Sequence, residues 1–208
     1  MTAPRQIPRL RLTETAAPHR EARKDAVLRV AKAMSAEGLV VGSVGNVSCR
    51  CGEAIIVTPT RLPYSRMGVD DLVTVSASGE TLDGKHRPSR ELPLHLALYR
   101  RRPDIGAVVH THSPHATAWS FLDSPLLPET EENHYYGIGP VRTTIVAAPG
   151  SADLATDAAE RLGDSAAVLL GRHGVLAAAA DPAAALEIAQ VVERQAQIAW
   201  ILRGGGAS

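Results

Sequence analysis

The sequence predicts an α/β fold, because helix-like and strand-like segments alternate along the chain. Three segments have the helical spacing of apolar residues, 20–37, 152–162 and 182–203. Four short apolar runs are typical of strands, 54–59 (AIIVTP), 72–76 (LVTVS), 105–110 (IGAVVH) and 166–170 (AAVLL). No segment is repeated, so the pattern indicates a single α/β unit.

In the first half of the chain, each predicted element has a boundary signal. The helix over 20–37 ends at Gly38, and residues 42–50 (GSVGNVSCR) are expected to form a glycine-containing turn before the first strand. Ser89 is the expected N-cap of a helix that runs to Arg101 and precedes the strand 105–110.

In the second half, proline and aspartate mark the helix starts. Pro114 opens a short helix, and Asp181 with Pro182 begins a long one that runs to Arg203. Residues 122–146 are rich in turn formers and receive no assignment. We expect this segment to be mobile or to lie between subunits.

The chain divides into one domain and two short tails. Residues 1–18 contain three prolines and no periodicity, and residues 204–208 are glycine-rich, so both are expected to be tails. The remaining residues, 19–203, belong to a chain that is 45% hydrophobic and long enough to bury a core. They form one predicted domain.

The charge balance argues against nucleic-acid and membrane partners. Lys plus Arg and Asp plus Glu both number 22, so no net field attracts nucleic acid. No apolar run approaches the roughly 18 residues of a membrane span, and the N-terminus lacks the apolar core of a signal peptide. These features predict a cytoplasmic protein.

Two kinds of side-chain chemistry are also disfavoured. Cys49 and Cys51 are too close for an ordinary disulfide and lack the second pair of a zinc ribbon, so they are expected to be reduced thiols. The three lysines, Lys24, Lys32 and Lys85, occupy exposed-looking positions, whereas a Schiff-base mechanism needs a desolvated lysine.

Three histidines are the strongest functional signal. His110 and His112 belong to AVVHTHSPHAT, where a strand would project residues i and i+2 to the same side, so both imidazoles can bind one metal ion. His173 in VLLGRHGVLA is a third candidate ligand. Three protein ligands leave a position for substrate or water, as in catalytic zinc sites.

Other interpretations of the histidines fit less well. A cupin needs a glutamate four or five residues after the second histidine, where Ala116 and Thr117 stand, and an amidohydrolase barrel needs about 250 residues. A purely structural role stays open, in which His110 and His112 cap a strand and His173 bonds to the backbone.

Glu91 is the candidate acid or base. It follows Ser89 in the predicted first turn of a helix, where it would serve equally well as a surface capping residue. Beside a metal, it could instead move a proton alpha to a carbonyl. The choice depends on distance, which the sequence does not give.

Two polar turns could bind an anion. Gly45 and Asn46 lie in SVGNVS, and Thr58 and Thr60 lie in TPTR, where N–H groups, an amide and hydroxyls can converge. Such residues also form turns without binding anything.

Taken together, the ordered motifs GNVS, TPT, PS-x-E, VVHTHS-x-HA and RHG resemble the class II aldolase/adducin family from about Arg20 to Arg203. The resemblance implies a three-layer α/β/α domain with a central, mainly antiparallel sheet. It also implies that zinc, or another divalent ion such as Mn²⁺ or Co²⁺, is held by His110, His112 and His173. Glu91 would then be the acid/base group.

The resemblance further implies an oligomer. In such aldolases a tyrosine of the neighbouring subunit handles the proton on the aldehyde-derived oxygen. The run HYYG makes Tyr135 the candidate, with Tyr136 as the alternative. A homotetramer with active sites at its subunit interfaces is therefore expected.

The implied phosphate pocket is only partly kept. The chain retains Gly45, Asn46, Thr60 and Ser89. Arg61 stands where the family usually has glycine, and Arg90 where it usually has a second serine. These arginines could strengthen anion binding, rearrange it, or select an unphosphorylated substrate. Arg90 could also simply pair with a neighbouring carboxylate.

The first functional interpretation is an aldehyde-lyase, a class II aldolase that reversibly cleaves a ketose, most simply a ketose 1-phosphate. The products would be dihydroxyacetone phosphate, or dihydroxyacetone, and an aldehyde, formed through a metal-stabilised enediolate. Sugar-phosphate 4-epimerases, dehydratases and decarboxylases of oxo-acid phosphates are the alternatives on the same scaffold. HTHSPHATAW looks like the epimerase version, but the epimerases resembling it usually carry aspartate where Glu91 stands. A non-enzymatic adducin-like interaction module would be expected to lose the metal ligands, which this chain keeps.

Overall fold

The core of the protein is one antiparallel sheet. The structure, a computed structural model, describes residues 17–122 and 124–204. The strands are β1 (Asn46–Cys51), β2 (Ala54–Val57), β3 (Val73–Ser76), β4 (Thr81–Asp83), β5 (Ala107–Thr111), β6 (Ala167–Leu170) and β7 (Gly174–Ala179). Their order in the sheet is β4-β3-β2-β1-β5-β7-β6. Every neighbouring pair is antiparallel.

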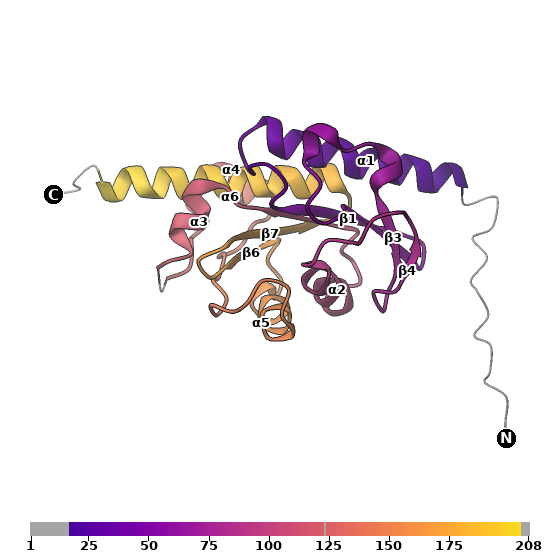
Figure 1. The fold of residues 1–208 in the computed structure, drawn as a ribbon. Coiled ribbons are helices and arrows are strands. Elements are labelled where there is room, and N and C mark those ends of the chain that lie inside the picture. The colour runs from indigo at the N-terminus through magenta and orange to yellow at the C-terminus, as the bar shows by residue number, and fades with distance from the viewer. Residues whose placement is uncertain (1–16, 123, 205–208) are drawn as a thin grey trace, which may run out of the picture.

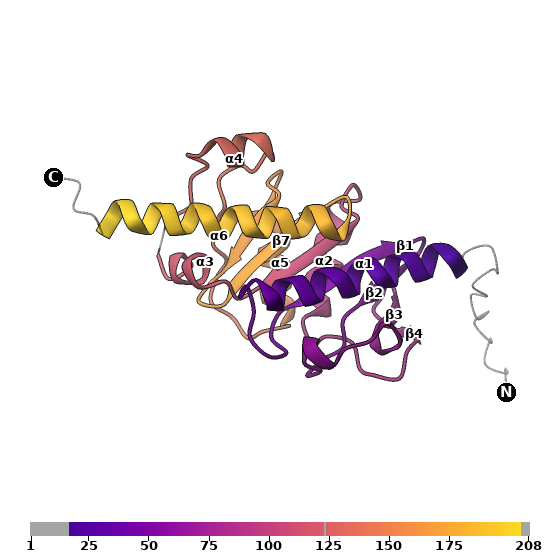
Figure 2. The same ribbon diagram turned by 90° about the horizontal axis from the view of Figure 1, so that it is seen from above.

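Helices cover both faces of this sheet. They are α1 (Ala17–Ala36), α2 (Leu92–Arg101), α3 (Pro114–Trp119), α4 (Glu131–Tyr135), α5 (Ala152–Leu162) and α6 (Pro182–Gly204). Helices α1 and α6 lie on one face, and α2 and α5 lie on the other (Figures 1 and 2). The predicted three-layer α/β/α fold with an antiparallel sheet is therefore confirmed.

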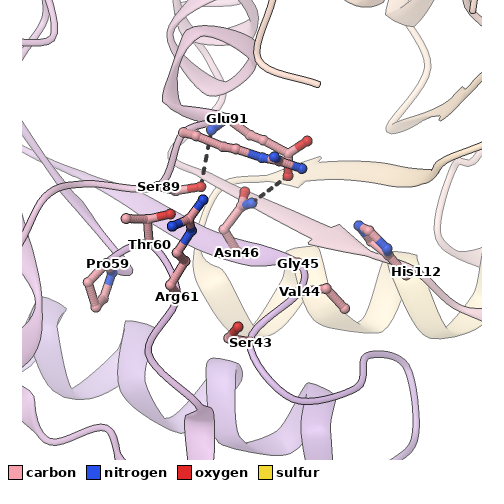
Figure 3. Close-up of a pocket in the computed structure, with 11 residues that line it drawn as sticks. Ser43, Val44, Gly45, Asn46, Pro59, Thr60, Arg61, Ser89, Glu91 and His112 are labelled. Carbon is pink, nitrogen blue, oxygen red and sulfur yellow. Dashed lines mark hydrogen bonds between the residues drawn. The ribbon is translucent and has the colours of Figure 1, made fainter. Parts of the chain in front are cut away.

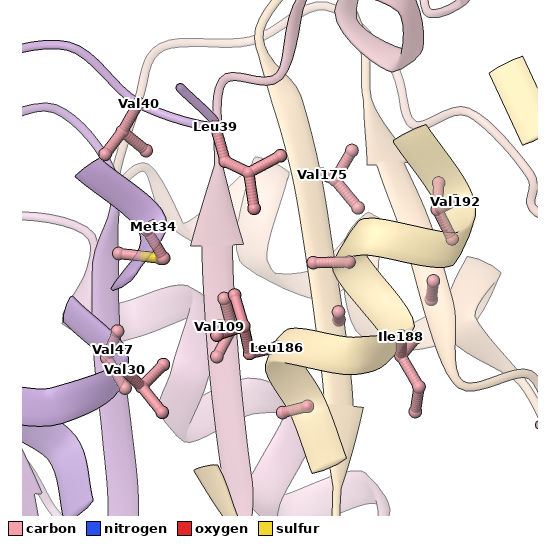
Figure 4. Packing of buried hydrophobic residues seen from close by; sticks show 14 of the residues in the cluster. Val30, Met34, Leu39, Val40, Val47, Val109, Val175, Leu186, Ile188 and Val192 are labelled. Carbon is pink, nitrogen blue, oxygen red and sulfur yellow. The ribbon is translucent and has the colours of Figure 1, made fainter. Parts of the chain in front are cut away.

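The sheet is buried on both faces because its strands alternate two sets of apolar side chains. Val47, Val109 and Val175 face α1 and α6, where they contact residues such as Met34 and Val192 (Figure 4). The other set packs against α2 and α5, and it includes Val108, Val168 and Leu176. This double burial explains the continuous apolar runs in the sequence.

Several predicted boundaries were wrong. The expected turn over 42–50 contains the start of β1 at Asn46, and Ser89 is not the N-cap of α2. That position belongs to Glu91, because Pro93 favours the first helical turn and a tight turn, closed by Leu92 N–H donating to Ser89 O at 3.1 Å, precedes it.

The ends of the domain differ slightly from the predicted ones. Helix α1 begins at Ala17 instead of residue 20, and α6 ends at Gly204 instead of residue 203. Of the two predicted tails, 1–16 and 205–208 lie outside the described residues. Among the described helices, none combines the length and apolarity needed to cross a membrane.

Candidate metal centre and substrate pocket

Four side chains meet where three parts of the chain come together. His110 is in β5, and His112 follows that strand directly. His173 lies in the turn between β6 and β7, and Glu91 immediately precedes α2. Because β5 pairs with β7, with His110 opposite Leu176, the turn that carries His173 lies beside the end of β5.

The four side chains surround one point. One ligand atom from each of Glu91, His110, His112 and His173 lies within 4.8 Å of all the others. Nε2 of His110 is 2.9 Å from Nε2 of His112 and 3.2 Å from Oε2 of Glu91. Nε2 of His173 is 3.3 Å from Oε1 of Glu91. Ligands at zinc bond lengths of about 2.0–2.1 Å are separated by roughly 3.3 Å in a tetrahedron. The spacing thus suits a small divalent ion.

The chemistry of these donors also fits a metal. Nδ1 of His110 donates to the carbonyl oxygen of Val175 at 2.8 Å, so in the neutral, metal-binding form of the ring the lone pair is on Nε2, toward the cluster. Oε1 of Glu91 is buried and has no hydrogen-bond partner among the described residues. An unpartnered carboxylate oxygen beside imidazole nitrogens is readily explained by a cation.

Glu91 is not a surface capping residue. Its side chain makes no capping hydrogen bond with α2, and the residue is 5% exposed. Instead, Oε2 accepts a hydrogen bond of 2.9 Å from Nδ2 of Asn46 (Figure 3). Burial alone would raise the pKa of the carboxyl, but the charges of His110 and His173 and the hydrogen bonds outweigh it and lower the pKa. The group is therefore held as a carboxylate.

Two of the histidines stay neutral at physiological pH. Burial, followed by the charge of His110, lowers the pKa of His112 to about 3 and that of His173 to about 4. The charge of Arg90, which lines the same pocket as His112, contributes to both shifts. Neutral imidazoles are the form that binds metals.

The candidate substrate residues line a single pocket next to this cluster. They are Gly45, Asn46, Thr60, Arg61, Ser89 and Arg90. The pocket has a volume of about 220 Å³ and is bordered by Glu91 and His112 as well. In Figure 3, Thr60, Arg61 and Ser89 gather on one side and His112 stands on the other. Thr58 is placed differently, since its hydroxyl accepts a hydrogen bond from Val47 N–H at 3.1 Å.

Two backbone positions in the pocket are unusual. Gly45 has a φ of +75°, and a Cβ there would overlap the carbonyl oxygen of His110 and the side chain of Val40, so only glycine fits. Arg61 has a φ of +59°, in the left-handed region that side chains other than Gly, Asn and Asp rarely adopt. Strained residues of this kind tend to occur at functional sites.

The tyrosines are not brought to this pocket within the chain. Tyr135 ends α4 and is 82% exposed, and Tyr136 follows it. Helix α4 lies beside α6, in the layer opposite α2 (Figures 1 and 2). Neither tyrosine is among the residues that line the pocket.

Comparison with known proteins identifies the family. The sequence model of the class II aldolase and adducin N-terminal domain matches residues 25–200. The chain belongs to the class II aldolase/adducin family. This family includes a curated relative from Salmonella paratyphi B, the L-ribulose-5-phosphate 4-epimerase UlaF. It is 36% identical over 180 residues, which cover 80% of this chain and 79% of the relative.

Solved structures of the class II aldolase/adducin family have the same fold. An L-fuculose 1-phosphate aldolase is 29% identical, with a TM-score of 0.83 and coverage of 89% of this chain and 88% of its own. The L-fuculose-1-phosphate aldolase of Thermus thermophilus is also 29% identical, with a TM-score of 0.78 and coverage of 90% and 98%. The chain thus belongs to a family that contains both epimerases and aldolases.

One buried residue near the site was missed by sequence analysis. His95 of α2 is fully buried and lies one helical turn after Glu91. Their spacing of four residues places them on the same side of the helix, and this pattern could have indicated His95 in the sequence.

Proposed function

We propose that the chain is a divalent-metal-dependent enzyme that breaks the C3–C4 bond of a ketose phosphate. The observation that carries this proposal is the buried Glu91 carboxylate among His110, His112 and His173, at the edge of a pocket that contains two arginines. A divalent ion bound there would polarise the substrate carbonyl and stabilise the negative charge that develops beside it.

Breaking this bond serves two reactions. When the O4 proton leaves, the C3–C4 electron pair passes toward the C2 carbonyl, which gives an enediolate and an aldehyde. An aldolase protonates the enediolate at C3 and releases both parts. An epimerase re-forms the bond on the other face of the aldehyde. Inversion at C4 by direct loss of the C4 proton is disfavoured, because C4 is not adjacent to the carbonyl.

Of the two, we place 4-epimerisation of a ketose 5-phosphate first. The support is the 36% identity to L-ribulose-5-phosphate 4-epimerase over four-fifths of the chain. The aldolase reaction, which sequence analysis put first, becomes the second candidate, and the fuculose 1-phosphate aldolase structure favours it. In the aldolase branch, Glu91 would deliver the proton to C3. In the epimerase branch, Glu91 and Tyr135 of the neighbouring subunit would remove the O4 proton before cleavage and return it after the bond re-forms.

The finer features of the proposal come from the resemblance. We propose zinc, or alternatively Mn²⁺ or Co²⁺, at His110, His112 and His173, and a cytoplasmic homotetramer. Tyr135 of one subunit would reach the pocket of its neighbour. Within its own chain, Tyr135 is exposed at the end of α4 and does not line the pocket.

Proton NMR in D₂O separates the branches. The zinc-loaded protein is given L-ribulose 5-phosphate and, separately, L-fuculose 1-phosphate. A C4 epimer without deuterium at C3 supports the epimerase. Free aldehyde with a deuterated three-carbon product supports the aldolase. No reaction of either compound, with or without metal, would overturn the proposal, and carbon dioxide release from an oxo-acid phosphate would then point to a decarboxylase.

Replacing Arg61 by glycine is expected to stabilise the fold but weaken substrate binding. Replacing Arg61 by glycine removes left-handed strain, so the free energy of unfolding is expected to rise by up to about 1 kcal/mol, after the entropy of the added glycine is subtracted. The same change removes a cation from the pocket, so KM for the phosphorylated substrate should rise about tenfold. Urea unfolding and steady-state kinetics measure the two effects.

A matched variant separates charge from strain. Arg61→Gln also lacks the charge, but glutamine rarely adopts the left-handed conformation, so this variant keeps the strain and its free energy of unfolding should stay near that of the wild type. Its KM should match that of Arg61→Gly. An unchanged KM in both variants would exclude Arg61 from anion binding.

A further inference from the structure

A chain of buried hydrogen bonds runs from Tyr99, near the C-terminal end of α2, to Glu91. Oη of Tyr99 is 2.8 Å from Oγ of Ser48, and that oxygen is 2.7 Å from Nδ1 of His95. Nε2 of His95 is 2.5 Å from Oδ1 of Asn46, whose Nδ2 donates to Oε2 of Glu91 at 2.9 Å. All five residues are buried.

The chain arises from two periodicities. Asn46 and Ser48 are alternate residues of β1, so they project from the same face of the sheet. Glu91, His95 and Tyr99 are spaced by four, so they lie along one side of α2 and its N-terminal turn. The strand and the helix therefore interlock through polar side chains within an otherwise apolar layer.

When His95 is neutral, only one arrangement of hydrogens satisfies every link. An ionised Glu91 can only accept, so the NH₂ group of Asn46 faces it and the amide oxygen faces His95. His95 must then carry its proton on Nε2 and accept from the hydroxyl of Ser48 through Nδ1. Ser48 in turn accepts from Tyr99. Every donor therefore points toward Glu91.

The protonation states agree with this direction. Burial is the main cause that lowers the pKa of His95 to about 3, so the ring is neutral. Burial also holds the pKa of Tyr99 well above its usual range, so its hydroxyl keeps the proton. The far end is fixed by Arg50, whose Nη2 donates to the Tyr99 carbonyl oxygen at 2.7 Å and whose guanidinium lies 4.7 Å from the ring centre.

We infer that His95 is a positioning residue that locks the amide of Asn46, and through it the carboxylate of Glu91. Without the Nε2–H donor, Oδ1 of Asn46 is buried without a partner, so the amide is no longer held in one orientation. Nδ2 then does not keep Oε2 of Glu91 in place, and the carboxylate can rotate away from its position beside the histidines. The inference deepens the proposed function and rests on it, because it matters for catalysis only if Glu91 moves the proton.

The chain orients groups and does not conduct protons. The amide of Asn46 does not take up and release protons under ordinary conditions, so a proton cannot pass from His95 to Glu91. The influence of each residue should therefore fade with its distance from Glu91. Loss of the His95 ring is expected to lower kcat most. Loss of the Ser48 hydroxyl should lower kcat less, and loss of the Tyr99 hydroxyl least.

The test compares His95→Leu with His95→Gln in the zinc-loaded, full-length protein. Leucine removes the donor at similar bulk, whereas the amide of glutamine can place an N–H near the position of Nε2. For the reaction that the wild type catalyses, kcat should fall about 10- to 100-fold in the leucine variant, in the range of other residues that orient active groups. KM and zinc content should stay unchanged, and glutamine should restore most of the rate.

Milder variants keep the inference falsifiable if His95→Leu does not fold. Ser48→Ala should lower kcat less than His95→Leu does, and Tyr99→Phe should lower it by no more than about threefold, within the cost of one neutral hydrogen bond. Thr74→Val is the matched control, because Thr74 is a buried residue of the same sheet whose hydroxyl has no hydrogen-bond partner among the described residues. If Thr74→Val lowers kcat as much as Ser48→Ala does, the loss in Ser48→Ala comes from general destabilisation of the sheet, and the inference is overturned.

A second readout does not depend on activity. Nitrogen-15 NMR of the wild type should show His95 with its proton on Nε2, and the side-chain amide signals of Asn46 should shift in Ser48→Ala but not in Thr74→Val. A proton on Nδ1 would overturn the inference even in an active enzyme. An inactive wild type with the expected spectra would instead refute the proposed function and leave the orientation of Asn46 established.

Discussion

Replacing Glu91 by glutamine is expected to lower kcat by about 10²- to 10⁴-fold, the range that a positioned acid or base contributes. Glutamine has nearly the same shape and can still accept the hydrogen bond from Asn46 through its amide oxygen, so the fold should persist. It cannot accept and return a proton. Steady-state kinetics in the reaction of the wild type, with circular dichroism and metal analysis on the same sample, measure the outcome.

Glu193→Gln is the matched control for this variant. Glu193 is another glutamate with a largely buried side chain, and it bonds to His115 outside the cluster, at 2.7 Å. Glu193→Gln should lower the free energy of unfolding and leave kcat nearly unchanged. Turnover near the wild-type rate in Glu91→Gln would exclude the acid/base role, whereas loss of metal together with activity would instead make Glu91 a ligand.

Replacing His112 by alanine is expected to abolish metal retention. Groups that only orient ligands contribute about 10- to 100-fold to metal affinity, so loss of a ligand itself should weaken binding by more than about 100-fold. His112 lies after the end of β5 and is only partly buried, so the sheet should still form. Metal content after dialysis and the metal-induced change in melting temperature measure the result.

His115→Ala provides the comparison for His112→Ala. His115 belongs to the same HTHSPH segment but bonds to Glu193 and is not part of the four-residue cluster. This variant should keep its metal. Normal zinc content in His112→Ala would show that the three histidines do not hold the ion together.

The elements predicted correctly from the sequence are strands made of apolar residues and helices with a clear boundary signal. Strands β2, β3, β5 and β6 are short apolar runs, and the helices α1 and α6 end near glycines. The position of His112 beside His110 followed from strand geometry alone. The position of His173 could not be predicted in this way, because it depends on the pairing of β5 with β7, which are distant in the sequence.

The missed elements have physical explanations. In β1, Asn46, Ser48 and Arg50 face α2 and form the polar contacts described above, so the strand has no apolar face on that side and resembled a turn. Strand β7 (GVLAAA) is rich in alanine, which is not typical of strands, yet it is held between β5 and β6. Tertiary packing overrides local preference in such central strands.

The pocket residues were easier to name than to interpret. The motif resemblance selected six residues that do line one pocket, but the backbone conformation of Arg61 and the burial of Glu91 were invisible in the sequence. Both depend on the path of the chain through distant segments. For Glu91 the structure decides between a surface cap and a buried carboxylate, which the sequence left open.

The hydrogen bond between His110 and the Val175 carbonyl links residues 65 positions apart and joins the cluster to the pairing of β5 with β7. The complete donor set can therefore assemble only after these two strands have met, a non-local and hence late event in folding. A divalent ion that binds this set would act on the native state after the rate-limiting step. Adding metal should slow unfolding and leave the refolding rate nearly unchanged, so the ion would lengthen the lifetime of the folded chain without guiding its formation.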